Sequence, residues 1–148
     1  MKKYLFILSV LTSILFINAA CEKETIIQAD QLPKNATEFI QLHFEGTTVV
    51  QVEKEKEGLS SATYDVILKN GTNIKFDKNG NWLEVDALDG QAIQTSFIHA
   101  NIKTYINSNY EGIAINSIEK DNNRYEVELV NGIDLLFNLD GNFIRIDN

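Results

Sequence analysis

The chain has 148 residues and a single cysteine, and its 21 acidic residues outnumber its 13 basic residues, which gives a formal net charge of −8. A negative surface repels nucleic acid and anionic lipid, so this charge argues against nucleic-acid binding. The single cysteine excludes an intrachain disulfide, even in an oxidising compartment.

The first 20 residues have the order of a secretory signal peptide. Two lysines precede an apolar stretch over 4–17, and the small residues Ala19 and Ala20 follow it. This stretch is shorter than the roughly 20 residues that span a bilayer. We therefore expect residues 1–20 to direct export and to be removed.

Cys21 lies where a bacterial lipobox carries its acylated cysteine. Asn18 departs from the aliphatic residue usual three places earlier, and the alternative is an incidental cysteine beside an ordinary cleavage site. We expect a lipid-anchored N-terminus at Cys21, in the cell envelope and facing the periplasm or the cell surface, with residues 21–31 as a tether. Removal of two lysines leaves 11 basic against 21 acidic residues, a charge of −10.

The rest of the chain divides into two repeats, predicted over residues 32–88 and 89–148. Tyr64-x-Val66 recurs as Tyr125-x-Val127 after 61 positions, and Phe44-Glu45-Gly46 recurs as Tyr110-Glu111-Gly112 after 66. Such spacing is the mark of tandem structural units.

Each repeat begins with a predicted helix. The first follows Pro33, with Asn35 or Thr37 as the N-cap and Gly46 past its end. The second has Thr95 or Ser96 as the expected N-cap and an apolar stripe at helical spacing, formed by Phe97, Ile98, Ile102, Tyr105 and Ile106.

Four predicted strands follow each helix. They cover residues 48–53, 63–69, 72–77 and 81–86 in the first repeat, and 113–120, 124–130, 133–138 and 142–147 in the second. A three-residue loop that ends at Gly71 pairs Val66 with Ile74 and makes both faces consistent.

The register of the next hairpin stays open. A three-residue loop places Trp82 and Phe143 on the core face and their neighbours Leu83, Val85, Ile144 and Ile146 on the other face, and a four-residue loop reverses this. Either register leaves apolar side chains on both faces, whereas one helix per repeat covers only one. These six residues are therefore the candidate binding residues, with Trp82 as an interface anchor or a core residue.

The chain resembles the PepSY-like, β-lactamase-inhibitor-like family of small exported bacterial proteins. The residues that carry the resemblance are the helix end at Phe44-Glu45-Gly46, the strand at Tyr64-x-Val66, and the run from Asn70-Gly71 to Gly80-x-Trp82, with their copies in the second repeat. The resemblance covers residues 32–148. It implies an α+β fold of two tandem repeats, each a helix packed on a four-stranded antiparallel sheet, with the sheets forming one broad face that the inhibitor of the family's name uses to grip its enzyme.

Catalytic and metal-binding patterns are weak. His43 and His99 lack the spacing of a metal site, and no serine has the surroundings of a nucleophile elbow. Asp77-x-Asn79-Gly80 resembles a calcium loop, but the twelfth position is Leu88 rather than glutamate, so a hairpin turn is the better interpretation. No metal, cofactor or enzymatic activity is expected.

The favoured hypothesis is a non-enzymatic binding module that engages an envelope protein or peptide through its sheet face. Two alternatives stay open. One is a sensor of calcium or a small molecule held between the repeats, and the other is a structural protein that associates with itself.

Overall fold

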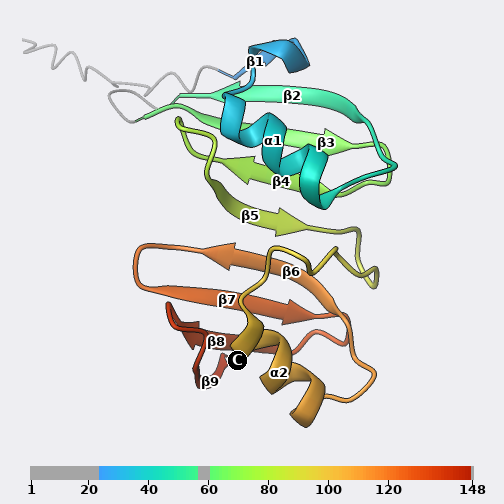
Figure 1. Cartoon of the computed structure of the whole chain (residues 1–148), viewed down its shortest axis with the longest axis vertical. Coiled ribbons are helices and arrows are strands. Elements are labelled where there is room, and N and C mark those ends of the chain that lie inside the picture. Colours follow the sequence, from blue (N-terminus) through green and yellow to red (C-terminus); the bar gives the residue numbers. More distant parts are fainter. Residues whose placement is uncertain (1–23, 57–60, 148) are drawn as a thin grey trace, which may run out of the picture.

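The computed structural model describes residues 24–56 and 61–147. This part of the chain forms one nine-stranded antiparallel sheet with both α-helices on the same face (Figure 1). The strand order follows the sequence, β1 to β9, without a crossover. None of the helices in the described ranges is long and apolar enough to cross a membrane. The predicted signal peptide and Cys21 lie outside the described residues.

The elements follow the two predicted repeats. The first contains α1 (Lys34–His43), β2 (Val49–Glu55), β3 (Thr63–Leu68), β4 (Asn73–Phe76) and β5 (Trp82–Asp86). The second contains α2 (Ala100–Asn109), β6 (Ile115–Lys120), β7 (Arg124–Leu129), β8 (Asp134–Asn138) and β9 (Phe143–Asp147). This confirms the α+β tandem fold, and the two four-stranded sheets join because β5 pairs with β6.

The segment predicted as a tether takes part in the fold. Thr25–Ile27 forms β1, which pairs with β2 and sets Ile27 opposite Val52, and Ala29–Gln31 forms a 3-10 helix. Ile27 packs against the core. The prediction of a free tether is therefore wrong over residues 25–31, because the segment pairs with β2 and buries Ile27 against the core.

Both helices begin at residues other than the predicted caps. Pro33 and His99 hold the N-cap positions, and the Nδ1 atom of His99 accepts a hydrogen bond from the Asn101 amide at 3.2 Å. The side-chain amides of Asn35 and Asn101 instead donate to the carbonyls of Asn79 and Asp140, at 3.1 and 2.8 Å. Each asparagine thus attaches the start of its helix to the second hairpin turn of its repeat.

The first hairpin of each repeat has the predicted register. Val66 pairs with Ile74 and Tyr64 with Phe76. Val127 likewise pairs with Leu135 and Tyr125 with Phe137. Gly71 has φ of +86°, the left-handed conformation that the three-residue loop requires.

The second hairpin resolves the open question through a β-bulge. Its loop has three residues, since the Asp77 amide donates to the Asn81 carbonyl, and Trp82 therefore pairs with Phe76 on the helix-covered face. Lys75 then pairs with Glu84, which leaves Leu83 as an extra residue and returns Val85 to the same face as Trp82. The prediction that Trp82 and Val85 lie on opposite faces is wrong, because neither simple register included this bulge. The register places other apolar residues on the far face, namely Ile26, Ile67 and Leu136.

Candidate functional site

The uncovered face of the sheet is strongly acidic. Alternation along β2–β9 and the cross-strand register place ten carboxylates on it: Glu53, Glu55, Asp65, Glu84, Asp86, Glu119, Glu126, Glu128, Asp134 and Asp147. Three cations share this face, Lys75, Arg124 and Arg145. We call this surface the open face. The sequence did not reveal it because the acids are scattered along the chain, and the strand register aligns them.

Carboxylates on the open face stand directly opposite one another across neighbouring strands. Glu84 pairs with Glu119, which pairs with Glu126, so three glutamates from β5, β6 and β7 form a row. A second row joins Glu128 to Asp134 and Asp147. Like charges in directly opposite positions destabilise a sheet, so these rows carry electrostatic repulsion within the folded chain.

Two open-face carboxylates of β5, Glu84 and Asp86, have raised pKa values. Partial burial raises the pKa of Glu84, and the carboxylates of Glu119 and Asp86 raise it further. Partial burial also raises the pKa of Asp86, with a contribution from Asp89. An added positive charge near these groups would favour their ionised forms.

Lys75 is the cation embedded among these acids. Its Nζ atom lies 3.3 Å from Glu55 and 3.5 Å from Asp65. Partial burial lowers the pKa of Lys75, but the attraction of the two carboxylates outweighs this effect and holds the pKa above its ordinary value. The pKa of Asp65 nevertheless stays raised, because its partial burial outweighs the attraction of the single lysine.

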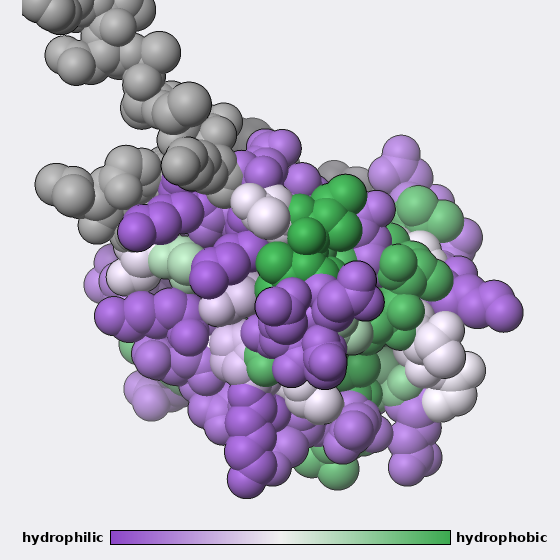
Figure 2. Space-filling model, turned by 90° about the horizontal axis from the view of Figure 1, so that it is seen from above, coloured by the Kyte–Doolittle hydropathy of each residue, from purple (hydrophilic) through white to green (hydrophobic). Residues whose placement is uncertain are grey.

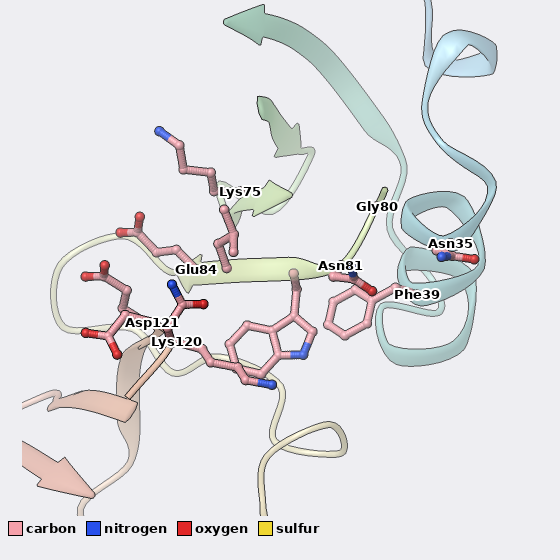
Figure 3. Close-up of a pocket in the computed structure, with 12 residues that line it drawn as sticks. Asn35, Phe39, Lys75, Gly80, Asn81, Glu84, Lys120 and Asp121 are labelled. Atoms are coloured by element: carbon pink, nitrogen blue, oxygen red, sulfur yellow. The ribbon is translucent and has the colours of Figure 1, made fainter. Parts of the chain in front are cut away.

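A cleft of about 810 Å³ opens where the two repeats meet. The β5–β6 ladder extends only over Glu84–Asp86 and Ser117–Glu119, so the start of β5 and the end of β6 separate. We call this space the seam cleft, and its lining includes Asn35, Phe39, Trp82, Leu83, Glu84, Glu119, Lys120 and Asp121. Figure 3 shows Asn35 and Phe39 of α1 at one end of β5 and Glu84 and Asp121 at the other.

Trp82 forms the aromatic wall of the seam cleft. Its ring stacks on Phe39 and on Tyr125, with centroid separations of 6.4 and 6.2 Å, and meets Phe97 edge-on at 5.2 Å. The Lys120 ammonium lies 5.9 Å from the centre of the indole ring. Trp82 is half-buried on the helix-covered face, so it serves the core and also borders the cleft.

The second repeat contains half of the same site. Asn101, Tyr105, Asn142 and Phe143 line a smaller hollow of about 380 Å³ and occupy the repeat positions of Asn35, Phe39, Asn81 and Trp82. Phe143 stacks on Tyr105 at 4.4 Å between ring centroids. In the described residues no strand follows β9 to supply the wall that β6 supplies in the first repeat.

The turn at Asp77 is a structural turn. The Asp77 carboxylate accepts hydrogen bonds from the amides of Asn79 and Asn81 at 2.8 and 2.9 Å, and from the Asn81 side chain at 2.9 Å. Partial burial raises its pKa, but these bonds together hold the pKa below its ordinary value. Asn138 makes the equivalent backbone contacts in the second repeat. Across residues 24–56 and 61–147, no group of three or more His, Cys, Asp or Glu side chains is arranged to hold a metal ion.

The histidines have structural surroundings. The Nδ1 atom of His43 lies 2.8 Å from the Ser96 hydroxyl, and its ring packs on Phe39 and Phe97. Burial lowers the pKa of His43. His99 caps α2, a role that the sequence analysis missed because histidine is an unusual N-cap.

Comparison with known proteins agrees with this architecture. The chain matches the family described as "Putative beta-lactamase-inhibitor-like, PepSY-like" over residues 17–60 and 62–145. The chain belongs to the PepSY-like family. The match falls in two segments, as expected for tandem repeats. No curated protein sequence matches this PepSY-like chain.

Three solved structures are similar to this PepSY-like chain. A Bacteroides thetaiotaomicron protein, described as a "putative calcium-regulated periplasmic protein", is 38% identical with a TM-score of 0.78, over 84% of this chain and 97% of the other. A Bacteroides vulgatus "putative periplasmic protein of unknown function" is 31% identical with a TM-score of 0.79, over 85% and 100%. A Bacteroides vulgatus "putative periplasmic protein from DUF2874 family" is 36% identical with a TM-score of 0.77, over 85% and 98%.

The six candidate binding residues of the PepSY-like chain have separate locations. Trp82 and Leu83 line the seam cleft, and Phe143 lines the smaller hollow. Val85 is 0% exposed, so it belongs to the core and is not available to a partner. Ile144 and Ile146 are exposed on the outer strand β9. The structure thus brings two of the six residues together at the seam cleft, and the six do not share one apolar face.

Proposed function

We propose that this chain is a periplasmic, non-enzymatic binding module, lipid-anchored at Cys21, whose open face engages a basic segment of another envelope protein or peptide. The row of carboxylates from Glu84 to Glu126 is the observation that supports this proposal. The predicted signal peptide and the periplasmic relatives support the location. Inhibition of a β-lactamase is not part of the proposal, because a shared fold does not transfer a function.

The excess of acids on the open face favours a cationic partner, although Arg124 already pairs with Glu126 and Arg145 with Asp147. Ten carboxylates and three cations leave the open face with a large negative charge, and directly opposed carboxylates gain when a positive group lies between them. A surface of one sign also accelerates the encounter with a partner of the opposite sign. Binding is therefore expected to be fast and sensitive to salt.

The seam cleft gives the partner a place to insert a side chain. Glu84 and Glu119 belong both to the open face and to the lining of the cleft, which Trp82 also lines. A lysine or arginine side chain that enters beside the two glutamates would reach the indole ring, which attracts cations as it attracts Lys120. The candidate residues Trp82 and Leu83 keep a binding role in this proposal.

Neutralising the glutamate row tests the proposal. The triple variant Glu84→Gln, Glu119→Gln and Glu126→Gln is compared with the full chain for capture of envelope proteins and for binding of a synthetic ten-residue lysine peptide. We expect the variant to weaken both, and we expect added salt to weaken capture by the wild-type chain. We prefer these changes to a substitution of Trp82. Trp82 packs on three aromatic rings, so its substitution would also loosen the core.

The matched control removes the same number of charges elsewhere. Glu38, Glu45 and Glu111 are exposed on or beside the helices, and their change to glutamine alters the net charge equally. If both triple variants weakened binding equally, the loss would be due to net charge alone, and a role of the open face would be refuted. Capture that neither variant alters would refute it as well.

Calcium is a second candidate, favoured by the relative described as calcium-regulated. Oxygen ligands suit calcium, but the Asp77 carboxylate already accepts hydrogen bonds within its turn. Calcium would then have to bind the carboxylate rows of the open face. Binding there would be weak, because no group of three acids in the described residues is arranged around a metal position. Calorimetric titration with calcium chloride should give millimolar binding that the Glu84, Glu119 and Glu126 triple variant abolishes. No heat up to about 10 mM calcium would exclude this candidate, since extracellular sites bind at about 0.1–1 mM.

The lipid anchor has its own test. Labelled palmitate should enter the full chain in living cells, and Cys21→Ala should remove the label. Retention of the label in Cys21→Ala would contradict lipidation at this residue. The result does not bear on the open face, so the two parts of the proposal stand separately.

A further inference from the structure

The outer strand β9 is the repeat counterpart of an inner strand. β5 has neighbours on both sides, β4 and β6, whereas β9 pairs only with β8 in the described part of the chain. Val85 in β5 is 0% exposed, and its counterpart Ile146 in β9 is 45% exposed. Ile144, the counterpart of Leu83, is 52% exposed. β9 thus presents apolar side chains and an unpaired backbone edge where β5 is covered by another strand.

The first repeat shows how such an edge is covered. β6 runs antiparallel to β5 and sets Ile118 opposite Val85, with Glu119 opposite Glu84 and Ser117 opposite Asp86. Three cross-strand pairs, with an apolar pair at the centre, form the ladder between the two repeats. An antiparallel strand beside β9 would likewise set an apolar residue opposite Ile146.

The charges of β9 select the strand that fits there. Where β5 has Glu84-Val85-Asp86, β9 has Arg145-Ile146-Asp147, so one acid has become a cation. If two copies of β9 meet antiparallel about a two-fold axis at Ile146, Ile146 faces Ile146 of the second copy. Arg145 then faces Asp147 of the second copy, and Asp147 faces Arg145 of the second copy. The strand is complementary to itself in apolar character and in charge.

The orientation of the side chains agrees with this pairing. Ile146 pairs with Leu135 on the helix-covered face, whereas Arg145 pairs with Leu136 and Asp147 with Asp134 on the open face. The Arg145 guanidinium already reaches the Asp147 carboxylate of its own strand, at 2.7 Å. Both charged groups therefore stand on one face and can exchange partners between copies.

We propose that two copies of this chain associate through β9, antiparallel about a two-fold axis at Ile146, to form one continuous sheet. The three cross-strand pairs equal in number those that join β5 to β6. An interface of this kind closes on itself, because the same surface is used on both copies. It leaves the glutamate row of β5–β7 free, so it is independent of the partner proposed for the open face.

A cysteine crosslink tests the pairing in the full chain within intact envelopes. Opposed residues of an antiparallel pair have Cα atoms about 4.5–5.5 Å apart, which a disulfide spans. Ile146→Cys should therefore yield a disulfide-linked dimer on mild oxidation. Leu139→Cys is the matched control, because Leu139 is 43% exposed but lies in the β8–β9 turn. The unmodified chain reports any background from Cys21, its only cysteine.

Charge reversal in the Ile146→Cys background supplies the second measurement. Arg145→Asp and Asp147→Arg each place like charges opposite one another twice, and each should lower the crosslinked fraction at least about fivefold. The double variant Arg145→Asp with Asp147→Arg restores both opposite-charge pairs and should restore the crosslink. Circular dichroism confirms that each variant folds. Absence of a dimer for Ile146→Cys, an equal yield for Leu139→Cys, or failure of the double variant to recover would each overturn the proposal.

Discussion

Gly80 and Gly141 lie where the start of each helix meets the second hairpin turn. Both have left-handed backbone conformations, with φ of +82° and +75°. A Cβ atom on Gly80 would approach the Ala36 amide nitrogen to 2.6 Å, and one on Gly141 would approach the His99 ring to 2.5 Å. These residues therefore combine a turn requirement with close packing, and they fix the distance between helix and sheet.

Gly80→Ala should destabilise the chain by more than about 2 kcal/mol, since the left-handed conformation alone costs about 1–2 kcal/mol and the backbone of α1 must also shift. Gly112→Ala is the control. Gly112 has φ of +77° but open space around its Cα, so only the conformational cost applies. Urea unfolding measures both values, and equal losses would show that the contact with α1 is unimportant.

At the scale of elements, the hairpins differ in how far the sequence predicts them. Alternation of Tyr64 and Val66 together with Gly71 was sufficient to predict the first hairpin, because turn chemistry and burial favour one register. The second could not be predicted, because Trp82, Leu83 and Val85 are all apolar and a β-bulge costs little in such a strand. The bulge places Trp82 and Val85 on one face, which removes the basis of the predicted apolar face.

The glutamate row of β5, β6 and β7 predicts an unusual response to pH. The pKa of Glu84 is higher in the folded chain than its ordinary value of 4.5, so the folded chain binds this proton more tightly and the group's contribution to stability falls as pH rises above 4.5. Glu84→Gln should therefore raise the free energy of unfolding at pH 7 by about 0.2–1 kcal/mol.

The gain from Glu84→Gln should vanish as the pH falls below 4.5, where the wild-type side chain also becomes neutral. Thermal unfolding between pH 3.5 and 7.5 measures this difference, with the exposed Glu111→Gln as a control that should show little change. A constant difference across this pH range would contradict the electrostatic cause.

At the scale of the whole molecule, the fold could be predicted from the sequence and the candidate site could not. The repeat spacing, the turn glycines and the family resemblance specify two helix-and-sheet units. The open face depends on which carboxylates become cross-strand neighbours, as with Glu84 and Glu119, which are far apart in the chain. The surface seen from above in Figure 2 is mostly hydrophilic, with a group of hydrophobic residues among the hydrophilic ones.

The distribution of charge predicts that salt stabilises the whole molecule. Raising NaCl from about 20 mM to about 500 mM shortens the screening length several-fold and weakens repulsion among the acids. The melting temperature should therefore rise, and it should rise less in the Glu84, Glu119 and Glu126 triple variant. Chelator is included throughout so that calcium does not contribute. A melting temperature that falls with salt would indicate that attractive ion pairs such as Lys75 with Glu55 dominate instead.

The uninterrupted order of strands from β1 to β9 also sets the width of the sheet across its strands. Strands lie about 4.8 Å apart, so the eight spacings from β1 to β9 amount to about 38 Å. A lipid on Cys21 would attach four residues before β1, at the edge opposite to β9. Two copies joined at β9 would place their β1 strands about 80 Å apart across the sheet. Such a pair would be attached to the membrane near both outer edges of its joined sheet, and the acidic faces of the two copies would form one extended surface between them.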